Sequence, residues 1–246
     1  MSTPGLTATL RDASPSAKAR LAGALYLLMI VLAGVGNSVE SRVVILGDAA
    51  ATAGNVLAHA SLLRMGWAAY LVEMALNIAV TALIYDLFKP VDRSLARLAV
   101  LFSIVAITIK TFSRFFLIAP LFLLGDTGTL AALGQAERAA VALSFLEVNA
   151  LGAGLAMVFF GFYSIISGYL IVRSTFMPRI LGAFGLVAGL GWLLFLWLPL
   201  GLRFGGYVAI FALTGAVAKI GWFLVRGGDD GRWTEQERVA AASIWA

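Results

Sequence analysis

Ionisable side chains lie well inside apolar stretches of this sequence. Glu73 and Asn77 are four residues apart, as are Lys110 and Arg114, so each pair lies on one face of a helix. A charge within a membrane-spanning helix costs about 3 kcal/mol or more, and it normally faces protein or water rather than lipid. These residues are therefore candidates for binding an ion, a proton or a charged ligand.

The depth of the charged residues predicts two ion pairs. At about 1.5 Å per residue, Glu73 and Lys110 lie roughly 13 and 15 Å inward from the outer ends of their spans. Arg114 lies roughly 9 Å inward, and Glu147 lies about one turn inside its own helix. We therefore expect Glu73 to pair with Lys110 and Arg114 to pair with Glu147.

Together, these groups predict a charge-balanced polar cavity in the outer half of the protein. Lys110 and Arg114 would hold an anionic head group, while Glu73 and Glu147 would keep the empty site neutral. The candidate ligand-binding residues are Glu40, Glu73, Asn77, Lys110, Arg114, Glu147 and Asn149.

A purely structural role is the alternative for these charges. Paired charges can fix the register of neighbouring helices without binding any ligand. Arg114 and Lys219 also lie close enough to a helix end for their side chains to snorkel towards the membrane surface.

The residue types that are rare or missing exclude several kinds of chemistry. The chain has no cysteine and only one histidine, His59, so disulfides, thiol catalysis and His-pair metal sites are excluded. No phosphate-binding, dinucleotide-binding, serine-elbow or HExxH motif is present. We therefore predict neither a metal nor a cofactor. The net charge of +5 does not indicate nucleic-acid binding, because no basic stripe with interleaved aromatic residues occurs.

The composition predicts how these residues are positioned. Of the 246 residues, 61% are hydrophobic and 13% are charged, about half the charged fraction of a typical soluble domain. The apolar residues form six long blocks without the period-two alternation of barrel strands. A helix needs roughly 20 apolar residues to cross a bilayer. We predict an all-α, six-helix transmembrane bundle with spans near Leu21–Val39, Met65–Phe88, Leu98–Leu124, Leu143–Val172, Ile180–Leu198 and Phe204–Val225.

The distribution of basic residues predicts the orientation. The connections on one side of the six spans hold eleven Lys and Arg residues, and those on the other side hold four. The positive-inside rule then places both termini in the cytoplasm. We expect a disordered tail over residues 1–19, a transmembrane domain over 20–226 and a cytoplasmic tail over 227–246. The expected partner is the lipid bilayer, together with a small-molecule or lipid ligand.

Shorter features predict local structure. Asp48 is suited to cap a helix that leads into the second span, and Gly125-Asp126 opens a second outer loop. Thr234 begins a sequence that resembles a capping box. Two sets of small residues predict close helix packing, and they are Gly152-Ala-Gly154 and Gly182, Gly185 and Gly189. Several tryptophans near span ends are typical of an aromatic belt, namely Trp67, Trp192, Trp197 and Trp222.

Several sequence motifs, in order along the chain, carry a family resemblance. They are Arg20-Leu-Ala-Gly-Ala-Leu-Tyr-Leu-Leu, Gly47-Asp-Ala-Ala-Ala-Thr-Ala-Gly-Asn, Phe159-Phe-Gly, Gly168-Tyr-Leu-Ile-Val-Arg-Ser and Met177-Pro-Arg-Ile-Leu-Gly. Over about Ala19 to Val225 the chain resembles the bacterial membrane-protein family known as domain of unknown function 4386. The resemblance implies a multi-helix membrane protein without an assigned activity, and it transfers no catalytic residue.

Three classes of function remain open at this point. The first is the binding or transport of a small charged or amphipathic ligand through the outward-facing polar cavity. The second is an intramembrane lipid-modifying enzyme, in which Glu73 or Glu147 would act as general acid or base. The third is an accessory or scaffold protein, in which the buried charges matter only for folding.

Overall fold

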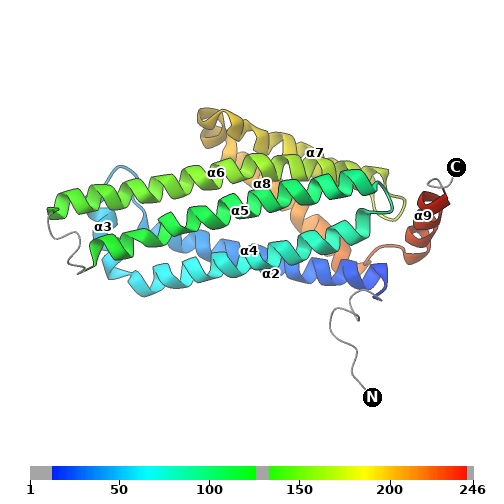
Figure 1. Cartoon of the computed structure of the whole chain (residues 1–246), viewed down its shortest axis with the longest axis horizontal. Coiled ribbons are helices and arrows are strands. Elements are labelled where there is room, and N and C mark those ends of the chain that lie inside the picture. The colour runs from blue at the N-terminus through cyan, green and yellow to red at the C-terminus, as the bar shows by residue number, and fades with distance from the viewer. Residues whose placement is uncertain (1–12, 126–132, 243–246) are drawn as a thin grey trace, which may run out of the picture. The chain divides into compact units, whose positions relative to one another are not determined.

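The computed structural model describes residues 13–125 and 133–242 and contains helices but no strand within these ranges (Figure 1). The helices are α2 (Pro15–Val43), α3 (Ala49–Ala58), α4 (Ala60–Phe88), α5 (Arg93–Leu124), α6 (Gln135–Arg173), α7 (Arg179–Trp192), the 3-10 helix η2 (Leu193–Leu196), α8 (Leu198–Val225) and α9 (Asp230–Ala242). The predicted all-α class is therefore confirmed.

Six helical segments in the described part of the chain are long and apolar enough to cross a membrane. They are α2, α4, α5, α6, α7 continued by η2, and α8. Each one contains or overlaps a predicted span, so the number and order of the predicted spans are confirmed.

The described residues divide into two compact units. The described part of unit 1 comprises residues 13–27, 77–104 and 157–242, and that of unit 2 comprises residues 28–76, 105–125 and 133–156. Four helices are divided between the two units, with one part in each: α2, α4, α5 and α6. Helix α3 lies wholly in unit 2, and α7, α8 and α9 lie wholly in unit 1.

Unit 2 has its core under α3. Val56 of α3 is fully buried with Val43 and Leu63, and Leu117 and Leu146 belong to the same cluster. The carboxylate of Asp48 accepts a hydrogen bond from the Ala51 N–H at 2.9 Å, as the predicted helix cap requires. Asp126 of the other outer loop lies outside the described residues.

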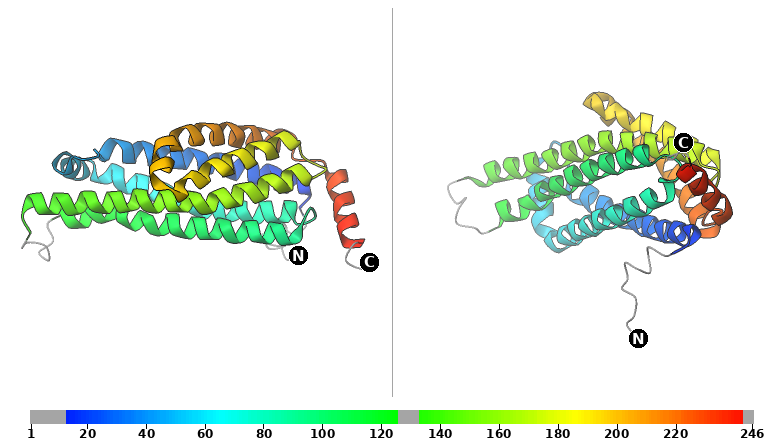
Figure 2. Two further views of the ribbon diagram at one scale, coloured as in Figure 1. Left: turned by 90° about the horizontal axis from the view of Figure 1, so that it is seen from above. Right: turned by 45° about the vertical axis from the view of Figure 1, so that its right-hand side comes forward.

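Unit 1 packs α7 against α6 through glycines on both helices. A Cβ atom at Gly168 of α6 would lie 2.8 Å from the Gly182 carbonyl oxygen, and one at Gly189 would lie 2.8 Å from the Gly161 carbonyl oxygen. Only glycine allows two helix backbones to approach this closely. The prediction of a packing face along Gly182, Gly185 and Gly189 is confirmed, and α8 in turn packs along α7 (Figure 2).

The segments predicted as separate N-terminal and C-terminal tails, residues 1–19 and 227–246, contact each other through Ser16 and Asp230. The Asp230 carboxylate accepts hydrogen bonds from the Ser16 N–H at 2.7 Å and the Ser16 hydroxyl at 2.8 Å. A carboxylate at a helix N-terminus stabilises the first turn. Helix α2 therefore begins at Pro15, and residues 15–19, expected in the disordered tail, are helical.

Helix α9 begins four residues before the predicted start at Thr234. The Asp229 carboxylate accepts a hydrogen bond from the Arg232 N–H at 3.0 Å, so Asp229, rather than Thr234, caps the first turn. The indole N–H of Trp233 donates to the Leu87 carbonyl at 2.9 Å and thereby holds α9 against the end of α4.

The packing of α7 on α6 predicts a large effect for a small substitution. A Cβ atom at Gly182 would lie 2.5 Å from the Gly168 carbonyl oxygen, so Gly182→Ala should lower the free energy of unfolding by about 1–3 kcal/mol. Gly206 in α8 has no atom within 4 Å of such a Cβ, so Gly206→Ala should leave stability unchanged or raise it by up to about 1 kcal/mol. Thermal unfolding in detergent, followed by circular dichroism, measures both variants. Equal melting temperatures would contradict this packing.

Candidate functional site

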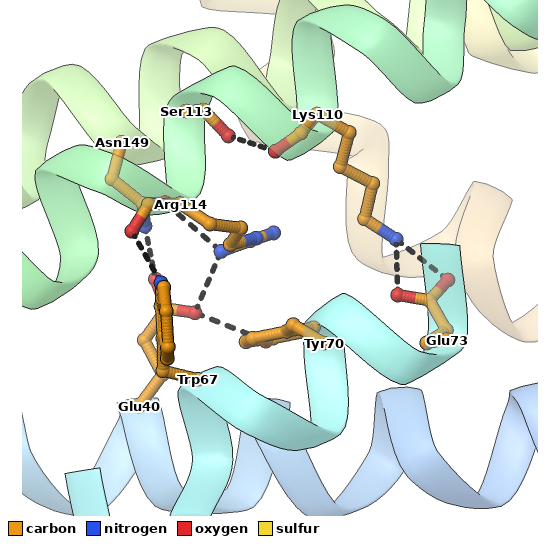
Figure 3. Close-up of polar contacts among 8 residues, drawn as sticks. All are labelled: Glu40, Trp67, Tyr70, Glu73, Lys110, Ser113, Arg114 and Asn149. Carbon is orange, nitrogen blue, oxygen red and sulfur yellow. Dashed lines mark hydrogen bonds and ion pairs between the residues drawn. The ribbon is translucent and has the colours of Figure 1, made fainter. Parts of the chain in front are cut away.

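Glu73 of α4 and Lys110 of α5 form an ion pair inside unit 2. The Lys110 ammonium donates to both carboxylate oxygens, at 3.0 and 3.1 Å (Figure 3). Glu73 is buried, and the Lys110 side chain is 18% exposed. The pair predicted from helix depth is therefore present, and each charge is neutralised by the other helix.

Arg114, one turn further along α5, contacts two other helices. Its Nη1 donates to the Asn149 side-chain oxygen of α6 at 2.9 Å and to Glu40 Oε2 of α2 at 3.3 Å. The Asn149 amide in turn donates to Glu40 Oε1 at 2.7 Å. The three side chains thus close a triangle of polar contacts across α2, α5 and α6 (Figure 3).

Tyr70 lies beside both groups of charges. Its hydroxyl donates to Glu40 Oε2 at 3.0 Å, and the Arg114 guanidinium lies over its ring at 3.9 Å from the centroid. The Lys110 ammonium is 6.0 Å from the same centroid. Gly36 of α2 makes room for this ring, since a Cβ there would lie 2.7 Å from Tyr70 Cζ. We call Glu40, Tyr70, Glu73, Lys110, Arg114 and Asn149 the charge network.

Two further side chains hold the backbone of α5 in place. The Trp67 indole N–H donates to the Arg114 carbonyl at 3.0 Å, and the Ser113 hydroxyl donates to the Lys110 carbonyl at 2.8 Å. Gly152 of α6 lies directly against Ser113, whose Cβ would be 2.7 Å from a Cβ at that glycine. The close packing predicted for Gly152 is confirmed, and it brings α6 near enough for Asn149 to reach Arg114.

The charge network is electrically balanced but not fully hydrogen-bonded. Two carboxylates face two cations, so the formal charges cancel. The Nε atom of Arg114 is buried and has no hydrogen-bond partner among the described residues. The Glu40 side chain is 22% exposed, in contrast to Arg114 at 4%. One donor is therefore left over at the centre of the network.

The predicted pairing of Arg114 with Glu147 is wrong. Arg114 pairs with Glu40 instead, and Glu147 is exposed. Glu147 and Asn149 are two residues apart and hence about 200° apart around the helix, so they cannot both face Arg114. Asn149 faces inward and is fully buried, which leaves Glu147 on the outer face of α6. The alternative in which Arg114 snorkels to the membrane surface is also wrong, since Arg114 is buried.

Asn77 does not join the charge network. It is half-buried, it falls within the residues of unit 1, and its side chain makes no hydrogen bond with the described residues. The other predicted site residues brought together are Glu40, Glu73, Lys110, Arg114 and Asn149.

Sequence reasoning missed Tyr70 and the contact made by Trp67. Trp67, Tyr70 and Glu73 are spaced three residues apart, which places them on one helical face. This spacing is the signal that would have found both residues. The interpretation of Trp67 as an aromatic-belt residue needs correction, because its indole N–H bonds to the α5 backbone.

Metal coordination finds no support in the residues described. No group of three or more His, Cys, Asp or Glu side chains among residues 13–125 and 133–242 is arranged to hold a metal ion. The side chains of the charge network offer hydrogen bonding and charge pairing by two carboxylates, two cations, a phenol and an amide.

Six membrane-length apolar helices, with a balanced charge network between four of them, define a multi-pass membrane protein. Residues 21–227 match the family described as Domain of unknown function (DUF4386), and the chain belongs to that family. An uncharacterized protein of Archaeoglobus fulgidus is 27% identical over 155 residues, which cover 62% of this chain and 77% of the relative. No solved structure matches the chain.

The triangle around Arg114 predicts that its members depend on one another. Arg114→Met leaves the Glu40 carboxylate without its cation, so the free energy of unfolding should fall by about 3–5 kcal/mol. The double variant Glu40→Gln/Arg114→Met should lose less than the sum of the two single losses. Glu147→Gln is the control on α6, and we expect a change within about 0.5 kcal/mol. Additive losses in a detergent unfolding titration would show that Glu40 and Arg114 do not interact.

Proposed function

We propose that this protein binds a small anionic or amphipathic ligand at the charge network, as the binding step of a receptor or transporter. The observation that carries the proposal is the buried Arg114 guanidinium, whose Nε has no hydrogen-bond partner among the described residues. A second cation, Lys110, lies one turn away on the same helix. Ionisable groups inside membrane spans are expensive and commonly mark ligand or ion pathways.

An incoming anion would bind the unused edge of Arg114. The contact between Arg114 and Glu40 is the longer of the two that Nη1 makes, at 3.3 Å against 2.9 Å to Asn149. A ligand carboxylate or phosphate that accepted a hydrogen bond from Nε would leave the contact between Nη1 and Asn149 in place. Glu40 can keep its bond to Tyr70, and it takes the neutralising role that the sequence analysis assigned to Glu147.

Lys110 and Glu73 supply the second half of the proposed site. The Lys110 side chain is partly exposed, so its ammonium can bind a ligand oxygen while Glu73 holds the other side. A ligand that carries one negative group and a polar or apolar remainder fits two neighbouring cations flanked by an aromatic ring. This is the same chemical class that the sequence predicted.

The proposed location is the bacterial cytoplasmic membrane, with both termini in the cytoplasm. The excess of Lys and Arg in the connections on that side supports this orientation. Glu40, Tyr70 and Arg114 lie towards the opposite ends of α2, α4 and α5, so the proposed ligand would enter from the outer side.

A structural role for the charge network is the second candidate. The observation that favours it is that each ionised group already has an oppositely charged partner within 3.3 Å. The protein would then be a scaffold whose charges fix helix register. The enzyme hypothesis is less favoured. Glu73, one of its two proposed acids or bases, is paired with Lys110, and the other, Glu147, lies on the exposed face of α6 outside the charge network.

Native mass spectrometry of the protein purified in mild detergent distinguishes the first two candidates. We expect a discrete added mass on the wild-type protein that is lost in Glu73→Gln/Lys110→Met, because that variant removes one cation of the site. The matched control is Asp86→Asn/Lys89→Met, which removes an ion pair of 2.9 Å near the end of α4 and should keep the added mass.

The opposite result would support the scaffold role. No added mass on either protein would contradict the binding proposal, and a lower thermal stability of Glu73→Gln/Lys110→Met than of the wild type would then support the structural role.

A further inference from the structure

Lys219 of α8 is a cation inside unit 1, far along the sequence from the charge network. It lies six residues before the end of α8 at Val225, which places its backbone roughly 9 Å inside the span. From its distance to the helix end, the Lys219 side chain could extend to the membrane surface. In the structure its ammonium lies over the ring of Tyr26 on α2 instead, 4.9 Å from the centroid.

The cation of Lys219 lacks the compensation that unit 2 gives to its cations. Lys110 and Arg114 each contact a carboxylate, whereas Lys219 forms no ion pair within the described residues. A tyrosine ring stabilises an ammonium only in part. An unpaired charge within a span therefore calls for an anion from elsewhere.

A cavity of about 60 Å³ lies beside Lys219 in unit 1. It has room for about four water molecules, which is close to the size of a carboxylate or phosphate group. Its polar lining residues are Tyr26, Tyr163, Ser164, Ser167, Trp192 and Lys219, and no Asp or Glu is among them. The cavity is thus rich in hydrogen-bond donors.

Trp192 provides a second, independent sign of a missing acceptor. Its indole N–H is buried and has no hydrogen-bond partner among the residues described. A buried N–H without an acceptor is costly, and such groups in folded proteins are nearly always paired. Because Trp192 is one of the lining residues, an anion bound in the cavity is a candidate acceptor for this donor. We predicted Trp192 to be part of an aromatic belt.

We infer that this cavity in unit 1 binds an oxyanion, the phosphate or carboxylate of a lipid or of a free small molecule, through Lys219 and Trp192. The anion neutralises the Lys219 ammonium and accepts the Trp192 N–H, while the tyrosine and serine hydroxyls complete its hydrogen bonds. This site is separate in sequence and composition from the charge network, so either site can exist without the other.

Thermal unfolding in a neutral maltoside detergent, followed by circular dichroism, tests the inference with three probes. They are inorganic phosphate, sodium oleate and dioleoyl phosphatidylglycerol, with dioleoyl phosphatidylcholine as the zwitterionic comparison lipid. At least one anionic probe should raise the melting temperature of the wild type saturably. A response to phosphatidylglycerol or oleate alone identifies a lipid source, and a response to inorganic phosphate identifies a free anion.

Variants then assign the response to this cavity. Lys219→Met should weaken half-saturation about tenfold, since it removes the charged donor. Arg203→Met is the matched control, because Arg203 is also a cation of α8 stacked on an aromatic ring, at 5.6 Å from the Phe204 centroid, but does not line the cavity. Glu73→Gln/Lys110→Met removes the cation of the charge network, so the part of the response that Lys219→Met loses should remain in this variant.

A second variant covers the case in which Lys219→Met does not fold. Trp192→Phe keeps the ring but deletes the N–H, and it should weaken half-saturation about threefold. The inference is wrong if none of the three anionic probes stabilises the wild type, or if Lys219→Met and Trp192→Phe both respond as the wild type does.

Discussion

The constraint on which unit 2 depends is that a carboxylate among membrane-spanning helices needs a cation from a different helix. Glu73 meets it through Lys110, and Glu40 meets it through Arg114. Both cations come from α5, one turn apart, so the register of α5 against α2 and α4 follows from these two pairs. Asn149 adds α6 to the same arrangement by bonding to Glu40 and Arg114 at once.

The two units differ in the groups that surround the cations within their membrane-spanning helices. In the charge network of unit 2 each cation has a carboxylate, and among its side chains the Arg114 Nε is the buried donor without a described partner. In unit 1 Lys219 has an aromatic ring and a donor-lined cavity but no acid within it. The charge network favours a ligand that replaces one partner of an existing ion pair. The cavity beside Lys219 favours an anion that forms an ion pair where none is present among the described residues. These differences make the two proposals independent.

The sequence was sufficient to predict features that depend only on position along a helix axis. Apolar block length gave the six spans, and depth along two helices matched Glu73 with Lys110. The sequence-based prediction was wrong where the direction of a side chain around the helix axis determined which residue contacts Arg114. Glu147 and Asn149 have similar depth, but only Asn149 faces inward, and depth alone cannot distinguish them. The choice of Glu40 as the partner of Arg114 depends on which helices are neighbours, and the helix order around a bundle is not encoded in the spacing of any one span.

A charge exchange between Glu73 and Lys110 tests the central claim most directly, namely that these two side chains neutralise each other. The measurement is the melting temperature in detergent of Glu73→Lys, Lys110→Glu and the double variant that carries both changes. Each single reversal places two like charges about 3 Å apart and should be strongly destabilised, whereas the double variant should recover at least half of the loss. Single variants as stable as the wild type, or a double variant no more stable than the weaker single variant, would contradict the account.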